Sequence, residues 1–181
     1  MSIRVLGDWG RFSASAAVCG APGAVLPVVD VRDADPAASP PELRTVRGET
    51  VFVAARDADA LERFCAENRI PVCRRPDVWG DLLEPFLDTE FGPRHRAETL
   101  DRLARSGIGS AEAARIRERV GPLVAAYNGV HGDWCHLGLA DLLDAAGSDL
   151  VPEGLRVPPR DRAAFRAWAM EIADRPLTRP V

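Results

Sequence analysis

Residues 76–91, PDVWGDLLEPFLDTEF, carry the clearest helical pattern of the chain. Apolar side chains recur there at the i, i+3, i+4, i+7 and i+8 spacing of one helical face, and acidic side chains follow the opposite face. Asp77 is a good N-cap, whereas Pro85 removes a backbone donor and crowds the preceding turn. We expect a helix that is kinked or split at Pro85 and buries one face. The opposite, acidic stripe should face solvent and comprises Asp77, Asp81, Glu84 and Asp88.

Residues 50–76 have the pattern of a strand, a helix and a second strand. Residues 50–55 are β-branched and apolar, and Asp57 is placed to cap a helix with an inward face of Leu61, Phe64, Cys65 and Asn68. Residues 70–74 form the returning strand, and such short links predict a parallel, right-handed crossover. Further strands are expected at residues 3–6, 14–19 and 24–31, with a proline-rich loop at 33–42. The first half should therefore contain a small mixed or parallel sheet with one βαβ unit.

Beyond residue 91 every strong pattern is helical. Pro93 should begin a helix that turns Ala97, Leu100 and Leu103 inward, and Ser110 should cap a longer one that kinks near Val120 because of the following Gly-Pro. Residues 134–146, capped by Asp133, and residues 160–173 complete the set. The predicted fold class is α+β, with an α/β-like sheet part at residues 1–75 and a helical part at 76–181, packed as one compact unit.

Composition favours an ordinary soluble protein. The chain has 181 residues, of which 46% are hydrophobic, so it can bury a real core. We find no apolar run long enough to cross a bilayer, and the opening MSIRVLGDWG lacks the pattern of a secretory signal. A cytoplasmic location is expected. The four cysteines form no paired CxxC unit and should be reduced thiols.

The charged residues exclude several kinds of chemistry. All 23 basic residues are arginine, so a P-loop lysine, a Schiff-base lysine and a lysine general base are excluded. Residues 1–75 hold ten arginines against ten acids, and residues 76–181 hold thirteen against seventeen. Because neither half is basic, general nucleic-acid binding is not expected.

The segment HGDWCH, residues 131–136, is the first candidate for chemistry. If Asp133 is an N-cap, Cys135 lies in the first turn of a helix, where unpaired amides and the helix dipole favour a thiolate nucleophile. His131 could then act as its base, as in cysteine-dependent acyl transfer. Alternatively His131, Cys135 and His136 could be three ligands of a zinc ion. In the third interpretation Cys135 packs inward and both histidines bind local backbone groups.

Aspartates near predicted strand ends are the second candidate. Asp8 follows the first strand, Asp30 and Asp33 follow the third, and Asp57 follows the fourth. Ligands of open parallel sheets bind beyond the carboxyl ends of strands, where carboxylates can hold magnesium for phosphate chemistry. Asp88 could join them. The competing interpretation is structural, with Asp57 as a helix cap and Asp8 and Asp33 as turn residues.

The sequence contains no complete catalytic motif. We therefore expect a non-catalytic intracellular protein that binds a protein partner, or a second copy of itself, through its helical half. The alternative is an enzyme, either a metal-assisted hydrolase or a cysteine-dependent acyl-transfer enzyme, using one of the two candidate clusters with zinc or magnesium. The test between them is whether His131, Cys135 and His136 converge in a polar pocket.

Overall fold

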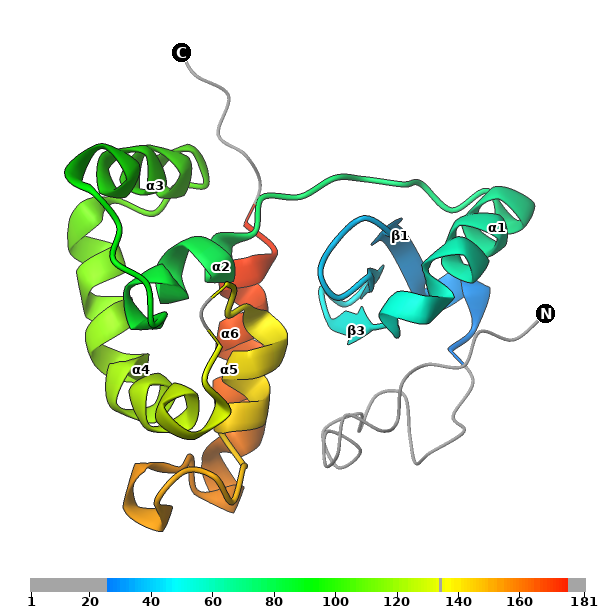
Figure 1. The fold of residues 1–181 in the computed structure, drawn as a ribbon. Helices are drawn as coiled ribbons and strands as arrows, with labels where there is room; N and C mark the ends of the chain where they lie inside the picture. The colour runs from blue at the N-terminus through cyan, green and yellow to red at the C-terminus, as the bar shows by residue number, and fades with distance from the viewer. Residues whose placement is uncertain (1–25, 134, 176–181) are drawn as a thin grey trace. The chain divides into compact units, whose positions relative to one another are not determined.

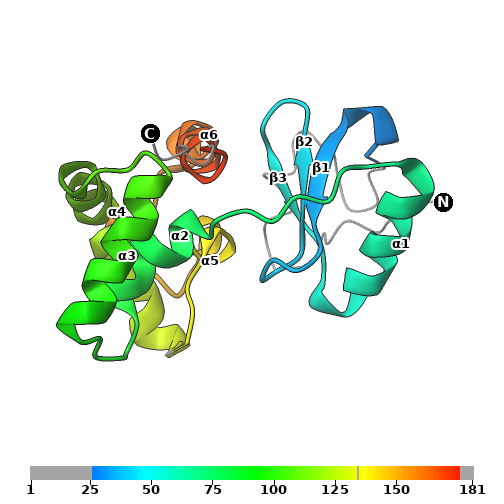
Figure 2. The same cartoon turned by 90° about the horizontal axis from the view of Figure 1, so that it is seen from above.

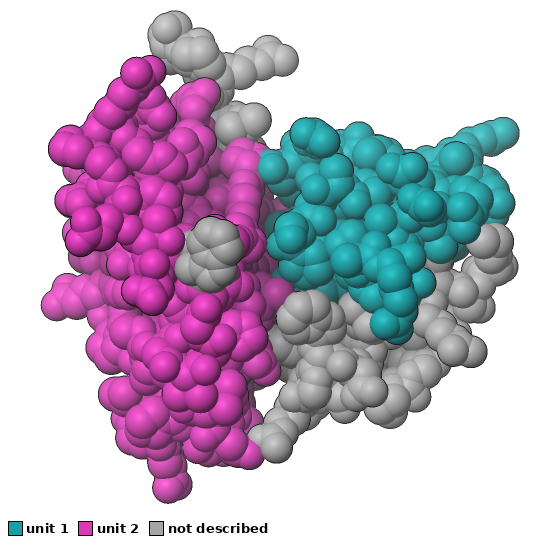
Figure 3. Space-filling view, in the orientation of Figure 1, with its two compact units in different colours: residues 1–75 teal, residues 76–181 magenta. Residues whose placement is uncertain are grey.

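The computed structural model describes residues 26–133 and 135–175, which fall into two compact units divided between Arg75 and Pro76 (Figure 3). Asp8 and the strands expected at residues 3–6 and 14–19 lie outside the described residues. A small sheet lies in unit 1 and helices make up unit 2, so the α+β class and the helical second half are confirmed. Among the described helices, none is both long and apolar enough to span a membrane.

Unit 1 is a three-stranded antiparallel sheet covered on one face by a helix. The strands β1 (Val31–Asp35), β2 (Glu42–Thr45) and β3 (Thr50–Phe52) pair in chain order, with Leu43 opposite Ala34 on one side and Val51 on the other. Figure 1 shows α1 (Ala58–Asn68) along this sheet. The core between them contains Val31, Ala34, Leu43, Val51, Val53, Leu61, Phe64, Cys65 and Ile70. Leu61, Phe64 and Cys65 are thus buried as predicted for α1, whereas Asn68 is only half-buried.

The returning strand expected at residues 70–74 is reduced to a single parallel bridge between Val72 and Ala34. The crossover through α1 thus exists, but it passes over β2 and β1 and ends on the outer side of β1 rather than beside β3. Of the two expected alternatives, a mixed or a parallel sheet, the parallel one is wrong, because the three strands pair antiparallel and the sheet is mixed only through this bridge. Asp57 stands at the N-cap position of α1 but makes no side-chain capping hydrogen bond.

Residues 33–42 were expected to be a loop, yet their first part belongs to β1, and β2 begins at Glu42. The strand at 24–31 was wrong too, since residues 28–30 form the 3-10 helix η2 (Val28–Asp30). The strands β1 and β2 were not predicted because strands were sought as apolar, β-branched runs, and the sheet face away from α1 is polar. On it, buried Asp33 accepts from Arg32 and Arg75, and Arg44 donates to Glu42 at 3.0 Å. Burial raises the pKa of Glu42, and Arg44 offsets only part of that effect.

Unit 2 is a helical bundle around α2 (Val78–Leu83), which Figures 1 and 2 show among the other helices of the unit. Trp79 of α2 is 1% exposed, and its indole Nε1 donates to the carbonyl of Ala169 at 2.8 Å. The remaining helices are η4 (Glu84–Phe86), α3 (Pro93–Arg105), α4 (Ser110–His131), α5 (Leu139–Ala145), η5 (Glu153–Leu155), η6 (Pro159–Asp161) and α6 (Arg162–Ala173). The expected split of the first helix at Pro85 is confirmed, because α2 gives way to η4 there.

Three expectations about unit 2 were wrong. In α3, Leu103 is buried as expected, but Ala97 and Leu100 are exposed and Thr99 is buried in their place. We expected Ser110 to cap α4, but Gly109 takes the N-cap position and Ser110 is the first residue of the helix, which continues through Pro122 to His131. The helix expected at 134–146 begins only at Leu139, so Cys135 does not lie in a first helical turn.

Candidate functional site

The loop that contains the HGDWCH segment is fastened to the end of α4. Gly132 closes that helix in the left-handed conformation, with φ of 72°. Buried Asn128 then donates to the carbonyls of Phe86 and Asp133, and its own side-chain oxygen accepts from the Asp133 amide at 2.8 Å. One side chain thus holds the loop against both α4 and η4.

Asp133 organises the next turn. Its Oδ1 accepts from the amides of Cys135 and His136, at 2.8 and 3.1 Å. Partial burial would raise the pKa of Asp133, but these two amide donors outweigh it and leave the pKa below its usual value. The aspartate therefore stays ionised and holds a tight turn rather than the start of a helix.

His136 joins this loop to the N-terminus of α2. Its Nε2 donates to Oδ2 of Asp77 at 2.6 Å, while Oδ1 of the same aspartate accepts from the Gly80 amide at 2.8 Å. The bond to Asp77 raises the pKa of His136, and the carboxylates of Asp141 and Asp133 act in the same direction. The imidazolium form is favoured as a result.

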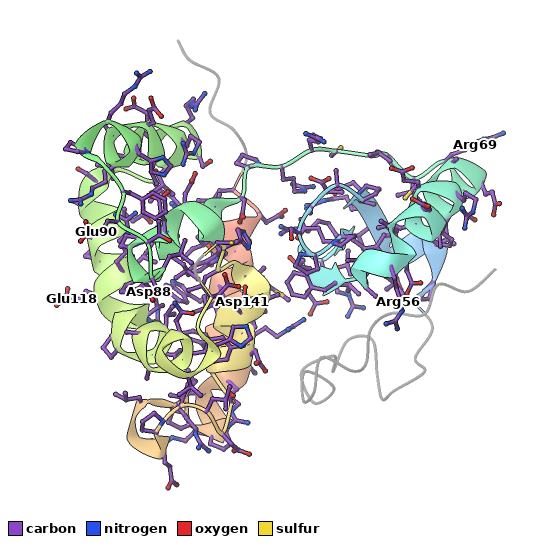
Figure 4. All side chains as sticks on the ribbon, in the orientation of Figure 1. Arg56, Arg69, Asp88, Glu90, Glu118 and Asp141 are labelled. Carbon is purple, nitrogen blue, oxygen red and sulfur yellow. The ribbon has the colours of Figure 1, made fainter. Side chains whose placement is uncertain are left out.

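Two glycines leave space for this pair. A Cβ on Gly80 would lie 2.3 Å from Oδ2 of Asp77, and a Cβ on Gly138 would lie 2.9 Å from Cε1 of His136. Asp141, on α5 and labelled in Figure 4, accepts from the Gly138 amide at 2.8 Å and fixes the chain beyond the histidine. Burial raises the pKa of Asp141. The pair is thus shaped from both sides by the backbone.

A pocket of about 390 Å³ opens between α2 and α3, next to this pair. Its lining residues are Pro76, Asp77, Asp81, Arg102 and Arg105. Arg102 binds Asp81 with two nitrogens, Nε at 2.9 Å and Nη2 at 2.7 Å from Oδ1. Burial raises the pKa of Asp81 in spite of this bidentate contact. Asp77 therefore both binds His136 and forms part of the pocket wall.

Further polar contacts make the pocket wall rigid. Arg117 of α4 donates to the carbonyls of Leu82 and Asp81, each at 3.0 Å, and so satisfies carbonyls near the end of α2. Burial lowers the pKa of Arg117. Glu84 accepts from Nε2 of His95 at 2.5 Å and from the Thr99 hydroxyl at 3.0 Å. These bonds tie α2 and η4 to α3 and α4.

Convergence of His131, Cys135 and His136 would favour an enzyme, but the structure does not bring the two histidine rings to a common partner. His131 ends α4 and stacks on Tyr127, with ring centroids 5.1 Å apart, and His136 binds Asp77. Cys135 is exposed, and its recorded hydrogen bond is the one its backbone amide donates to Asp133. The three residues share a loop, but each histidine ring engages a different partner.

The strand-end aspartates are dispersed as well. Asp30 ends η2, Asp57 precedes α1, and Asp33 lies within β1 between two arginines. Asp88 belongs to unit 2, where Figure 4 shows it in the chain after η4. Within residues 26–133 and 135–175 no three histidine, cysteine or acidic side chains are grouped as a metal site. The zinc and magnesium hypotheses gain no support from that part of the chain.

Sequence reasoning missed the pocket. It treated the acidic stripe as solvent-facing, yet the side chains of Asp81 and Glu84 are only 14% and 12% exposed because they pair with α3. Arg102 and Arg105 were not singled out, although their i, i+3 spacing on a helix places both on one face. A comparison with protein-family models, curated proteins and solved structures finds no match for this chain.

Proposed function

We propose that the protein is a non-catalytic binding protein of the cytoplasm whose helical unit receives an acidic side chain of a protein partner in the α2–α3 pocket. The observation that carries this proposal is that polar groups of the HGDWCH segment, which could have been catalytic, are held in structural hydrogen bonds. Asp133 holds a turn, and His136 and Asp77 hold each other beside the pocket. Asp133, His136 and Asp77 thus hold the loop in place beside the pocket, where a partner could bind. The free thiols of Cys65, Cys73 and Cys135 are consistent with a reducing compartment.

The charges around the pocket indicate the chemistry of the partner. Asp81 and Arg102 neutralise each other, and the imidazolium form of His136 compensates Asp77. Arg105 is exposed and lines the pocket, so a carboxylate that enters the pocket can approach its guanidinium group. The volume of the pocket is within the range of about 300–1,000 Å³ typical of ligand pockets. The pocket therefore has room for a side chain and its neighbours.

Site-specific photo-crosslinking tests the proposal. A photoreactive residue replaces exposed Asp101, one turn before Arg105, and the control replaces exposed Glu118 on α4. The proposal predicts a discrete adduct from position 101 alone. The identified protein should then bind the purified chain about tenfold more weakly when Arg105→Glu reverses the charge, a loss of about 1.4 kcal/mol. Equal adducts from both positions, or binding unaffected by Arg105→Glu, would contradict it.

One observation favours a second candidate, cysteine-dependent acyl transfer. Cys135 is exposed and directly precedes His136 in the chain, and Asp77 binds that histidine as an aspartate binds a catalytic base. If this function holds, iodoacetamide will alkylate Cys135 faster at neutral pH than exposed Cys73, and His136→Gln will remove the difference. Equal rates for the two thiols would exclude an activated Cys135.

A further inference from the structure

The segment that leads out of α1 forms an outer edge of the sheet in unit 1. The Ala34 amide donates to the Pro71 carbonyl at 3.0 Å, and the Cys73 amide donates to the Ala34 carbonyl at 2.8 Å. Further along, the Arg75 amide donates to Oδ2 of Asp35 at 3.0 Å. Three hydrogen bonds, all to β1, thus hold residues 71–75 in an extended line.

These bonds decide which backbone groups point outward. In an extended strand the N–H and C=O of one residue point to the same side, and successive residues alternate. Residues 71, 73 and 75 face β1, so Val72 and Arg74 direct their N–H and C=O away from the sheet. Pro71 sits at an inward position, so its missing N–H leaves the outer side intact.

The outer side is accessible. Residues 71–74 are all exposed, and Val72 is a large hydrophobic residue that is 58% exposed. A strand edge with outward N–H and C=O groups is a template for another strand. This edge is short, because the Ile70 amide already donates to Cys65 and Pro76 has no N–H to offer.

We propose that two copies of this chain pair through residues 72–74, in antiparallel orientation about a two-fold axis at Cys73. In this register Val72 of each copy lies opposite Arg74 of the other, and the two residues exchange both N–H···O=C bonds. Four hydrogen bonds form, joining the two sheets into one.

The alternatives in register are worse. An axis at Val72 would set Arg74 against Ile70, whose N–H is already bonded. An axis at Arg74 would set two guanidinium groups directly opposite each other and Val72 against Pro76. Only the axis at Cys73 uses every outward donor and separates the like charges. The edge formed by residues 72–74 is thus complementary to itself, which favours a second copy of this chain as its partner.

The register makes a direct prediction about Cys73. The two Cys73 residues form a non-hydrogen-bonded antiparallel pair, with Cα atoms about 4.5 Å apart, which a disulfide can span. Copper phenanthroline should therefore convert the two thiols into an intermolecular disulfide. Cys73→Ser should abolish this covalent dimer, whereas Cys135→Ser, which removes the other exposed cysteine among residues 26–133 and 135–175, should not.

Sedimentation equilibrium of the reduced full chain measures the non-covalent association. The wild type should show a concentration-dependent dimer, and Val72→Pro should weaken it at least about tenfold while far-UV circular dichroism is unchanged, since the lost N–H points outward. Arg105→Glu, which tests the helical pocket, should leave the dimer intact. A monomeric wild type would overturn the proposal, and so would a dimer that crosslinks through Cys135 instead of Cys73.

Discussion

Asp77 and His136 are 59 residues apart in the chain, yet their side chains meet at 2.6 Å and join the start of α2 to the loop after α4. The same carboxylate caps α2 through the Gly80 amide and lines the α2–α3 pocket. This one aspartate therefore links helix capping, the position of the HGDWCH segment and the candidate binding surface. Changing it, or the space around it, should affect all three.

Gly80→Ala tests the space beside Asp77. Because the new Cβ would lie 2.3 Å from Oδ2, the carboxylate must move and lose its capping bond, which should lower the free energy of unfolding by about 1–2 kcal/mol. The matched control is Gly129→Ala in α4, where a Cβ meets nothing within 4 Å. That change should stabilise the protein by up to about 1 kcal/mol. Urea unfolding compares the two, and equal effects would contradict the steric account.

Asn128→Ala tests how the loop is held. The substitution removes three hydrogen bonds, to the carbonyls of Phe86 and Asp133 and from the Asp133 amide, at a buried position. We expect a loss of about 2–3 kcal/mol in urea unfolding. The control, Asn68→Ala in α1, removes a single bond to Phe64 and should cost about 1 kcal/mol or less. A smaller loss at Asn128 than at Asn68 would mean that the loop is held by other contacts.

Trp79→Phe tests the centre of unit 2. Trp79 is buried and donates to Ala169, so the smaller ring leaves a cavity and a carbonyl without its donor. The expected cost is about 2–4 kcal/mol. Trp168→Phe is the control, because Trp168 is half-buried and contacts Trp79 edge to face with centroids 5.6 Å apart. Thermal unfolding should show the larger drop for Trp79, and the reverse order would contradict its central place.

The predictable part of the fold follows from local periodicity. The helix α1 could be predicted because Leu61, Phe64 and Cys65 are spaced with the helical turn. The break after α2 could be predicted from Pro85. β1 and β2 were not predicted because polar residues such as Asp33, Glu42 and Arg44 are favourable in a buried strand only when they are paired, and Asp33 pairs with Arg75, which lies 42 residues further along the chain. Such pairing is a property of the folded chain, which no local pattern displays.

The start of α5 was misplaced for a related reason. Asp133 accepts from the amides two and three residues ahead, as an N-cap does, but the chain makes a single turn and enters a helix only at Leu139. The local signal for a cap and for such a turn is the same. Only part of the candidate site could be predicted from the sequence. His136 was a candidate because of its residue type, whereas its partner Asp77 and the neighbouring Arg102 come close only when distant helices pack.

The stability of the protein should depend on pH through His136. Since its pKa is raised in the folded state, the stabilisation is full below the ordinary histidine value of about 6.5 and is lost as the pH rises through the folded pKa. Asp77→Asn keeps a capping side chain but removes the charge. The wild type should exceed this variant in stability most clearly between about pH 5 and 6.5, by urea unfolding, and less at higher pH. A constant difference across the range would be incompatible with an ion pair.

The most direct test of the account is an NMR titration of the His136 ring in the wild type and in Asp77→Asn. The ion pair between Asp77 and His136 fixes the loop beside the pocket. It predicts a titration midpoint above the ordinary histidine value in the wild type and a lower midpoint in the variant. Midpoints that coincide in the two proteins would show that the pair does not exist in solution and would contradict the account.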